Sequence, residues 1–187
     1  MIDPLTLPDD LPRPEDDGAA DHLAGASMPA IGLPSTDGDM LALNELGHDV
    51  LTVLFCYPRT GRPGEPLLVE EWDSIPGARG CTPETCGFRD LHAEFEAAGA
   101  RVFGLSTQGT AYQAELAERL RLPFPILSDE QLELTRALRL PTMQVSGLTL
   151  IKRLTLVVDE GSISHVFYPV FPPDRHAQEV FAWLGQR

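Results

Sequence analysis

Short, continuous apolar runs alternate along this chain with segments whose apolar residues recur at helical spacing. The run at 50–57 is apolar almost throughout, which is typical of a strand buried on both faces of a sheet. Other runs, bounded by turn residues, predict strands at 101–106, 124–127, 148–158 and 163–170. Helical spacing predicts helices at 82–98, 110–121, 129–139 and 174–185. The alternation of the two patterns predicts an α/β fold with a central mixed β-sheet flanked by helices.

Two segments before the cysteine-containing helix differ in composition from the rest. Residues 1–28 are rich in proline, aspartate and alanine, which predicts an extended, mostly irregular acidic arm rather than a domain; packing of this arm on the protein surface stays open. Residues 29–187 then form one domain, and Asp37-Gly38 between two apolar stretches predicts a β-hairpin near its start. The stretch 59–79 surrounds an apolar middle with glycine and proline, so we expect a long functional loop that packs against the domain.

Composition narrows the class of protein. The chain has 187 residues, of which 43% are hydrophobic, and this suffices for one buried core. Its formal net charge of −14 argues against a nucleic-acid partner or an anionic membrane surface. No apolar run approaches a membrane span, and the first residues lack the basic and hydrophobic regions of an export signal. We therefore expect a cytoplasmic protein, in which three cysteines are more often catalytic or redox-active than structural.

Cys81 and Cys86 lie five residues apart, where a loop becomes a helix. Cys81 precedes Thr82, Pro83 and Glu84, which together form a helix start with a hydroxyl residue, a proline and an acid. A thiol at this place faces unpaired backbone N–H groups and the positive end of the helix dipole. Because both favour the thiolate, we expect a lowered pKa for Cys81 and a nucleophilic sulfur.

The spacing of the two cysteines restricts how they can react with each other. In a regular helix, Cα atoms five residues apart are separated by about 8–9 Å. A disulfide requires Cα atoms within roughly 7 Å. The helix must therefore unwind before Cys81 and Cys86 can bond, and Pro83 and Gly87 make unwinding easier. Such a pair suits oxidation of Cys81 to a sulfenic acid, followed by condensation with Cys86.

Three other interpretations of the cysteines carry less weight. In the first, Cys81 and Cys86 are small apolar helix residues without chemistry. In the second they bind a metal, but C-x4-C is not a usual zinc spacing, and only Cys56 and scattered histidines remain to complete a site. The third, a thiol-disulfide oxidoreductase, is disfavoured because the C-x-x-C spacing is absent. Cys56 itself lies in a predicted buried strand, where we expect a packed small hydrophobe.

The segment around the cysteines resembles a known family. Residues 80–90 read GCTPETCGFRD, which is similar to the G-C-T-x-E-x-C-x-F-R-D segment of peroxiredoxins in the peroxiredoxin Q, or bacterioferritin comigratory protein, group. The similarity extends over roughly residues 27–184 and includes ordered matches at 55–58, 104–107, 127–129 and 153–159. Several matches in one order are more specific than the cysteine pair alone.

The resemblance implies a thioredoxin-like fold and a thiol peroxidase that reduces hydrogen peroxide and organic hydroperoxides. Cys81 matches the peroxidatic cysteine of the family, and Cys86 matches the resolving cysteine of its intrachain type. Arg153 matches the arginine that helps hold the thiolate and the peroxide oxygens, a role that suits a permanent cation with several donors. The resemblance further implies reduction of the disulfide by thioredoxin or a similar dithiol, and no metal, flavin or haem cofactor.

The chain departs from the family pattern in front of Cys81. The family has a threonine three residues before the attacking cysteine, where this chain has Ala78, because about sixteen extra residues follow Pro58. The family also has a proline before that threonine. If the 59–79 insertion loops out and returns, Pro58 and Thr60 supply this proline and threonine. In the alternative, Pro76 shields Cys81 locally. In either case we expect the insertion to shape access to Cys81.

Two rival functions stay open at this point. One is a one-cysteine peroxidase, in which Cys86 is a spectator and an external thiol reduces the sulfenic acid. The other is a non-enzymatic redox sensor, in which the disulfide changes the helix and thereby the binding of a partner. If the chain is a two-cysteine peroxiredoxin, as the resemblance implies, we expect a hydroperoxide substrate, a thioredoxin-like reductant, and a monomer or weak homodimer.

Overall fold

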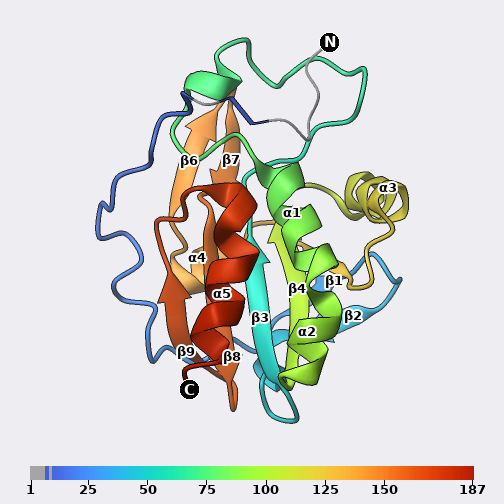
Figure 1. The fold of residues 1–187 in the computed structure, drawn as a ribbon, viewed down its shortest axis with the longest axis vertical. Helices are drawn as coiled ribbons and strands as arrows, with labels where there is room; N and C mark the ends of the chain where they lie inside the picture. Colours follow the sequence, from blue (N-terminus) through green and yellow to red (C-terminus); the bar gives the residue numbers. More distant parts are fainter. Residues whose placement is uncertain (1–6, 9) are drawn as a thin grey trace.

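The computed structural model describes residues 7–8 and 10–187 of the chain. At its centre lies a five-stranded sheet in the order β5-β4-β3-β8-β9 (Figure 1). Strands β3, β4 and β5 run parallel, whereas β8 and β9 pair antiparallel with their neighbours, so the predicted mixed sheet is confirmed. The strands are β3 (Leu51–Cys56), β4 (Ala100–Ser106), β5 (Ile126–Ser128), β8 (Leu154–Asp159) and β9 (Ser162–Phe167).

Strand β3 occupies the middle of the sheet because both of its faces are apolar. Val53 and Phe55 contribute to the cluster that contains the apolar residues of α1, α2 and α5. Leu54 and Cys56 contribute to the cluster on the opposite face, and all four residues are 0% exposed. The helices that cross the first face in Figure 1 are α1 (Cys81–Asp90), α2 (His92–Ala97) and α5 (His176–Leu184).

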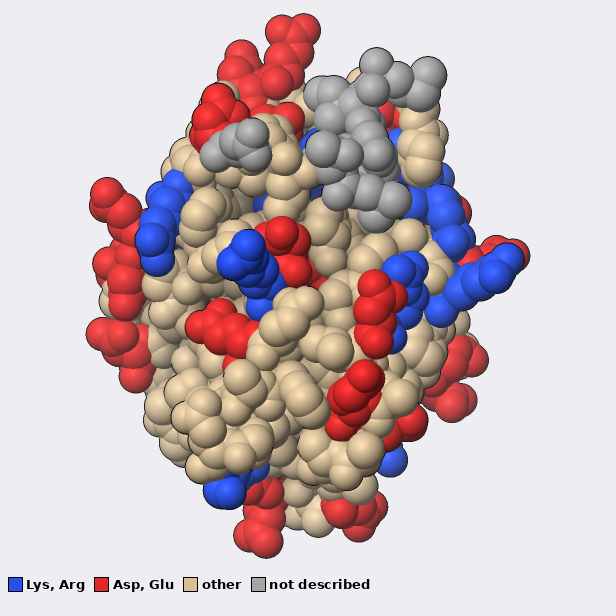
Figure 2. Space-filling model, in the orientation of Figure 1, with Lys and Arg blue, Asp and Glu red and all other residues tan. Residues whose placement is uncertain are grey.

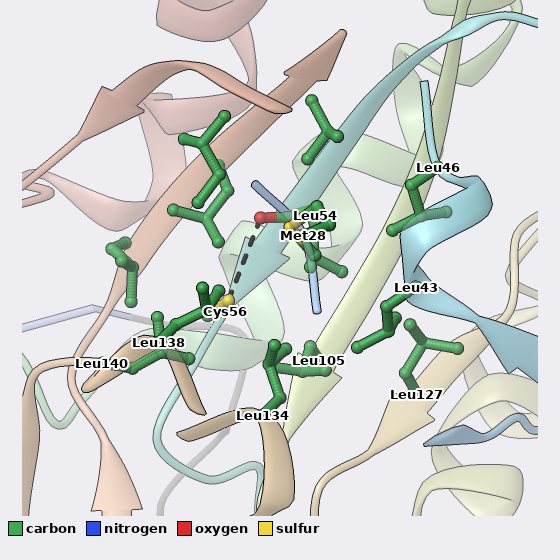
Figure 3. Packing of buried hydrophobic residues seen from close by; sticks show 14 of the residues in the cluster. Met28, Leu43, Leu46, Leu54, Cys56, Leu105, Leu127, Leu134, Leu138 and Leu140 are labelled. Carbon is green, nitrogen blue, oxygen red and sulfur yellow. Dashed lines mark hydrogen bonds between the residues drawn. The ribbon is translucent and has the colours of Figure 1, made fainter. Parts of the chain in front are cut away.

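The cluster on the opposite face explains the third cysteine. Figure 3 shows Cys56 among leucines that include Leu134 and Leu138 of the short helix α4 (Glu133–Leu138). The Cys56 thiol donates a long hydrogen bond of 3.9 Å to the carbonyl oxygen of Leu54. Burial also raises the pKa of the Cys56 thiol well above its ordinary value. The expectation that Cys56 packs as a small hydrophobe is confirmed.

The predicted strand at 148–158 is wrong as a single element. Its first part is β7 (Leu148–Ile151), which forms a separate hairpin with β6 (Thr142–Val145), a strand that the sequence analysis did not predict. Strand β8 begins only after Lys152 and Arg153. The interruption has a physical cause, since Arg153 is buried in an ion pair with a residue of α1 and so leaves the regular ladder.

The helices follow their predictions with two exceptions. The predicted helix at 82–98 is two helices, α1 and α2, which meet at Leu91. Helix α4 starts four residues later than predicted, because the Asp129 carboxylate accepts hydrogen bonds from the N–H groups of Leu134 and Thr135 at 3.1 and 2.8 Å. Helices α3 (Thr110–Leu120) and α5 lie within two residues of their predicted bounds.

The N-terminal segments lie against the two edges of the sheet, the hairpin beside β5 and the preceding residues beside β9. The predicted hairpin consists of β1 (Gly32–Pro34) and β2 (Met40–Ala42) and is confirmed. Before it, the blue trace in Figure 1 passes beside β9, and the N–H of Met28 donates to the carbonyl of Gly161 at 2.8 Å. Leu23 is fully buried in the core. Ala20, Leu23 and Met28 therefore anchor the described part of the 1–28 segment on the sheet.

The 59–79 insertion packs down, as its apolar middle predicts. It contains one short 3₁₀-helix, η2 (Trp72–Ser74), and Trp72 is buried against Val145 and Leu150 of the β6–β7 hairpin. The hairpin thus supports the insertion from one side. No helix in residues 7–8 and 10–187 combines the length and apolar character needed to cross a membrane.

Candidate active site

Cys81 is the first residue of α1, at a sharp turn of the backbone. Gly80 before it has a φ of 102°, in the left-handed region that favours glycine. A Cβ atom at Gly80 would also lie 2.3 Å from Cγ of Pro173, so the turn approaches the 3₁₀-helix η3 (Pro173–Arg175), just before α5, too closely for a side chain. This turn puts Cys81 at the helix N-terminus, where the sequence predicts it.

Arg153 lies directly beside the sulfur. Its Nη2 donates to Sγ of Cys81 at 3.2 Å, and the same nitrogen donates to the carbonyl oxygens of Arg79 and Gly77 at 3.0 and 3.3 Å. Its Nη1 donates to the carboxylate of Glu84 in a buried ion pair. The interruption between β7 and β8 is what brings this guanidinium under the start of α1. The structure therefore brings together the two residues that the sequence analysis pairs.

The electrostatic balance at Cys81 corrects the expectation of a lowered pKa. Burial is the largest influence and raises the pKa of the Cys81 thiol above its ordinary value. The charge of Arg153 and the backbone N–H of Arg59 lower this pKa, whereas the carboxylate of Glu84 raises it. Cys81 is only 3% exposed, and at such a buried site its position at the helix start is not enough to keep the thiol ionised. Ionisation of Cys81 depends on the two donors, and on Arg153 above all.

Glu84 has a more specific place than the helix dipole explains. Its side chain is completely buried, and burial raises the pKa of its carboxyl while Arg153 lowers it. One of its oxygens pairs with Arg153, which joins Glu84 and Cys81 through a single guanidinium. In the sequence this residue looks like an ordinary acid in a first helical turn. Only its burial identifies it as the counter-ion of Arg153.

Thr60 and Pro58 lie where the looped-out insertion would place them. Thr60 is buried in the lining of the cavity that contains Cys81, and its N–H and hydroxyl both donate to Oε1 of Gln108, at 2.9 and 3.1 Å. Gln108 in turn donates to the carbonyl of Thr60 at 3.1 Å. Pro58 is buried just after β3. Pro76 is exposed and lines a different cavity, so the alternative of local shielding by Pro76 is wrong.

A cavity of about 480 Å³ opens onto Cys81. One part of its wall comes from the loop around Cys81 and from Thr60, and another part comes from the middle of the 59–79 insertion. Tyr112 of α3 closes a third side. Cys81 is thus nearly inaccessible to bulk solvent but lies in the wall of a space that admits a small molecule.

Cys86 lies on the same helix, one and a half turns after Cys81. It is half-buried, and burial raises the pKa of its thiol. Both cysteines are free and helical, so their Cα atoms keep the helical separation of about 8–9 Å. The hydroxyl of Thr85 also donates to the carbonyl of Cys81 at 2.8 Å, which fixes the first turn. In this helical arrangement the two sulfurs are too far apart to bond unless the first turns unwind.

Two residues of the site, Gln108 and Tyr112, are not predicted from the sequence. Gln108 follows β4 and accepts hydrogen bonds from Thr60, while Tyr112 lies in the first turn of α3 and contacts the guanidinium groups of Arg59 and Arg62. A glutamine or tyrosine in a helix start carries no chemical signal of its own in the sequence. Within the part of the chain that the structure describes, no group of three or more histidines, cysteines or acids is arranged to hold a metal.

Comparisons with known sequences all match the chain to one family of proteins. The profile of the redoxin family matches residues 23–181. The chloroplastic peroxiredoxin Q of Gentiana triflora is 30% identical over 186 residues, which cover 96% of this chain and 77% of that protein. A putative peroxiredoxin of Mycobacterium tuberculosis strain H37Rv is 33% identical over 153 residues, which cover 81% of this chain and 89% of the relative.

Solved structures agree with the sequence relatives. Peroxidoxin BcpB of Mycobacterium tuberculosis superposes with a TM-score of 0.70 at 31% identity, covering 87% of this chain and 96% of that one. Peroxiredoxin Q of Xanthomonas campestris gives 0.68 at 25% identity, covering 88% and 98%. The thioredoxin-like fold and the family resemblance are therefore confirmed. With this fold, and with relatives of this kind over most of its length, the chain belongs to the peroxiredoxins, in the peroxiredoxin Q and bacterioferritin comigratory protein group.

Proposed function

We propose that this peroxiredoxin reduces hydroperoxides by attack of the Cys81 thiolate on the terminal peroxide oxygen. The sulfur–oxygen bond forms as the oxygen–oxygen bond breaks, and two electrons pass from the sulfur to the peroxide. Cys81 becomes a sulfenic acid, and the leaving oxygen takes a proton from solvent to depart as water or an alcohol. The step requires no metal or organic cofactor.

One observation carries the proposal. The guanidinium of Arg153 donates to the Cys81 sulfur at 3.2 Å at the edge of a cavity of about 480 Å³. A nucleophile, its cation and a space for the substrate are therefore in one place. Arg153 stabilises the thiolate before the attack, and its position suits the negative charge that develops on the leaving oxygen afterwards.

Thr60 and Pro58 are proposed as the residues that orient and shield the peroxide. The Thr60 hydroxyl is held by Gln108 in the wall of the Cys81 cavity, where it can exchange that partner for a peroxide oxygen. Pro58 is buried next to it and helps to exclude water from the sulfur. In a water-poor pocket, each hydrogen bond to the developing charge is stronger than it would be in bulk solvent.

Cys86 is proposed as the resolving cysteine. Its thiol condenses with the Cys81 sulfenic acid, so that a disulfide forms and water leaves. This requires the first turns of α1 to unwind, which also separates Glu84 from Arg153. A dithiol protein of the thioredoxin type then reduces the disulfide by exchange and becomes oxidised itself. The half-buried position of Cys86 makes it reachable once the helix loosens.

The setting that fits this cycle is a reducing compartment, and we propose the cytoplasm. Both thiols must return to the free state that the structure shows. The net charge of −14 supports a small-molecule substrate and a protein reductant rather than a nucleic-acid or membrane partner. For the same protein we propose a monomer or a weak homodimer.

The test is peroxide consumption driven by thioredoxin, measured for four forms of the protein. We expect turnover by the wild type and by Cys56→Ser, whose sulfur is buried away from the site. Cys81→Ser should be inactive. Cys86→Ser should consume one equivalent of peroxide and then stop with thioredoxin as the reductant. Sustained thioredoxin-driven turnover by Cys86→Ser would replace the disulfide mechanism with the one-cysteine alternative, and activity of Cys81→Ser would refute the proposal itself.

A further inference from the structure

The cavity beside Cys81 is far larger than hydrogen peroxide requires. Its volume of about 480 Å³ lies in the range of roughly 300–1,000 Å³ that is typical of small-molecule sites. A water molecule, which is close to hydrogen peroxide in size, occupies only about 30 Å³ in the liquid. The extra volume is therefore available for the organic part of a larger hydroperoxide.

One wall of the cavity is apolar and belongs to the insertion. Trp72 anchors this wall, because it is only 5% exposed and packs against the β6–β7 hairpin. Leu67 and Leu68 pack on the same cluster while they line the cavity. A hydrocarbon chain that lies on this wall gains the free energy of apolar burial. The apolar residues that line the cavity are Pro66, Leu67, Leu68 and Trp72.

The side of the cavity formed by Tyr112 is basic. The guanidinium carbon of Arg62 lies 4.1 Å from the centre of the Tyr112 ring, and that of Arg59 lies 5.2 Å from it. Arg62 is already neutralised, since Glu115 and Glu65 lie 3.3 and 3.6 Å from its guanidinium. The ion pair of Arg62 with Glu115 therefore connects the insertion to α3.

Arg59 is different, because among residues 7–8 and 10–187 no acidic side chain lies within ion-pair distance of its guanidinium. It is half-buried in the lining of the Cys81 cavity, and its ring contact is the one to Tyr112. Figure 2 shows acidic side chains over much of the molecule, while Lys and Arg gather at the upper right, over α3 and the adjoining insertion. On a chain with net charge −14, a cation that faces a cavity and has no acidic partner among the described residues is suited to an anionic ligand.

We propose that the cavity selects organic hydroperoxides that carry a carboxylate, with Arg59 binding the carboxylate and the Trp72 wall holding the hydrocarbon chain. The inference rests on the proposed function, because Cys81 performs the same two-electron reduction of the hydroperoxide to an alcohol. The backbone N–H of Arg59 interacts with the Cys81 sulfur, whereas its side chain extends to Tyr112. The carboxylate and the hydroperoxide of the substrate are therefore separated by a chain about as long as an arginine side chain.

The experiment compares two probes that differ only in charge, the ω-hydroperoxide of octanoic acid and the methyl ester of the same compound. The second-order rate constant for oxidation of Cys81 is measured by rapid mixing at low ionic strength. For the wild type we expect the acid to react roughly tenfold faster than the ester, as a charge-assisted hydrogen bond implies. In Arg59→Gln this ratio should fall to about one, and in Arg59→Lys it should be retained in part. Added salt should reduce the wild-type ratio.

Arg101→Gln is the matched control, because it removes the same charge from an exposed residue of β4 outside the cavity. This variant should keep the wild-type ratio. A wild-type ratio near one, or an unchanged ratio in both Arg59 variants, would overturn the inference while hydrogen peroxide still oxidises Cys81. If neither probe nor hydrogen peroxide oxidises Cys81 in the wild type, it is the proposed function that fails.

Discussion

Replacement of Arg153 by methionine tests how the buried guanidinium controls Cys81. Methionine keeps much of the length of the side chain but removes the charge and every donor. The lost hydrogen bond to the sulfur is charge-assisted whenever Cys81 is ionised, and such bonds contribute about 1.5–3 kcal/mol. One pKa unit corresponds to about 1.36 kcal/mol, so the pKa of Cys81 should rise by roughly one to two units.

The sign of the effect on reactivity follows from the chemistry. The thiolate is the reactive form, and below the pKa its fraction falls about tenfold for each unit by which the pKa rises. At neutral pH, Arg153→Met should therefore react with peroxide roughly 10–100-fold more slowly than the wild type. Arg153→Lys keeps the charge but loses the fork of donors, so its rate should lie between the two.

The assay is alkylation of Cys81 by iodoacetamide as a function of pH, in a Cys86→Ser background. The midpoint of the rate profile reports the pKa of Cys81 directly. We expect an upward shift of the midpoint in Arg153→Met and a smaller one in Arg153→Lys. An unchanged midpoint in Arg153→Met would show that the guanidinium does not hold the thiolate, and the reasoning would be refuted.

The same substitution leaves Glu84 buried without its cation. Removal of one member of a buried ion pair typically costs about 3–5 kcal/mol, although protonation of Glu84 can limit the loss. The double variant Arg153→Met with Glu84→Gln removes both charges and should recover much of this stability. Its alkylation midpoint should still lie above that of the wild type, which separates the effect on Cys81 from a general loss of folding.

Three further predictions follow from individual contacts. Glu84→Gln removes a carboxylate that raises the pKa of Cys81, so its alkylation midpoint should shift to lower pH, and an upward shift would contradict the assigned charge balance. Gly80→Ala should lower the free energy of unfolding by at least about 2 kcal/mol in urea titrations, and by more than Gly38→Ala, which has a similar φ but open space around it. Burial raises the pKa of the fully buried Tyr57 far above its ordinary value, so the unfolded chain ionises first and stability falls as pH rises past about 10. The phenolate absorbance that Tyr57 contributes should appear only together with loss of circular dichroism.

Much of the fold follows from local sequence signals. Strand β3 is recognisable because its apolar run is continuous and all its residues from Thr52 to Cys56 are buried, and the hairpin of β1 and β2 is recognisable from Asp37-Gly38. The placement of Cys81 and Cys86 on one helix follows from the helix start at 82–84. These features depend on residues that are close in sequence.

The remaining features depend on distant residues. The predicted strand at 148–158 is interrupted because Arg153 pairs with Glu84, which lies 69 positions earlier, and no local pattern encodes that pairing. Cys81 likewise belongs to a buried cluster that also contains Phe55 of β3 and Ala177 of α5, and its burial reverses the expected direction of the pKa shift. The position of Thr60 beside Cys81 cannot be predicted from local sequence, because it depends on how the 59–79 insertion returns to the domain.

The central claim is that Cys81 carries out the oxidation and Cys86 completes it, and intact mass spectrometry tests this most directly. The reduced protein is treated with one equivalent of hydrogen peroxide, quenched, and compared with Cys81→Ser and Cys86→Ser. The wild type should lose two hydrogens, Cys86→Ser should gain one oxygen, and Cys81→Ser should keep its mass. If Cys81→Ser is oxidised as readily as the wild type, or if the wild type gains oxygen without forming the disulfide, the account is contradicted.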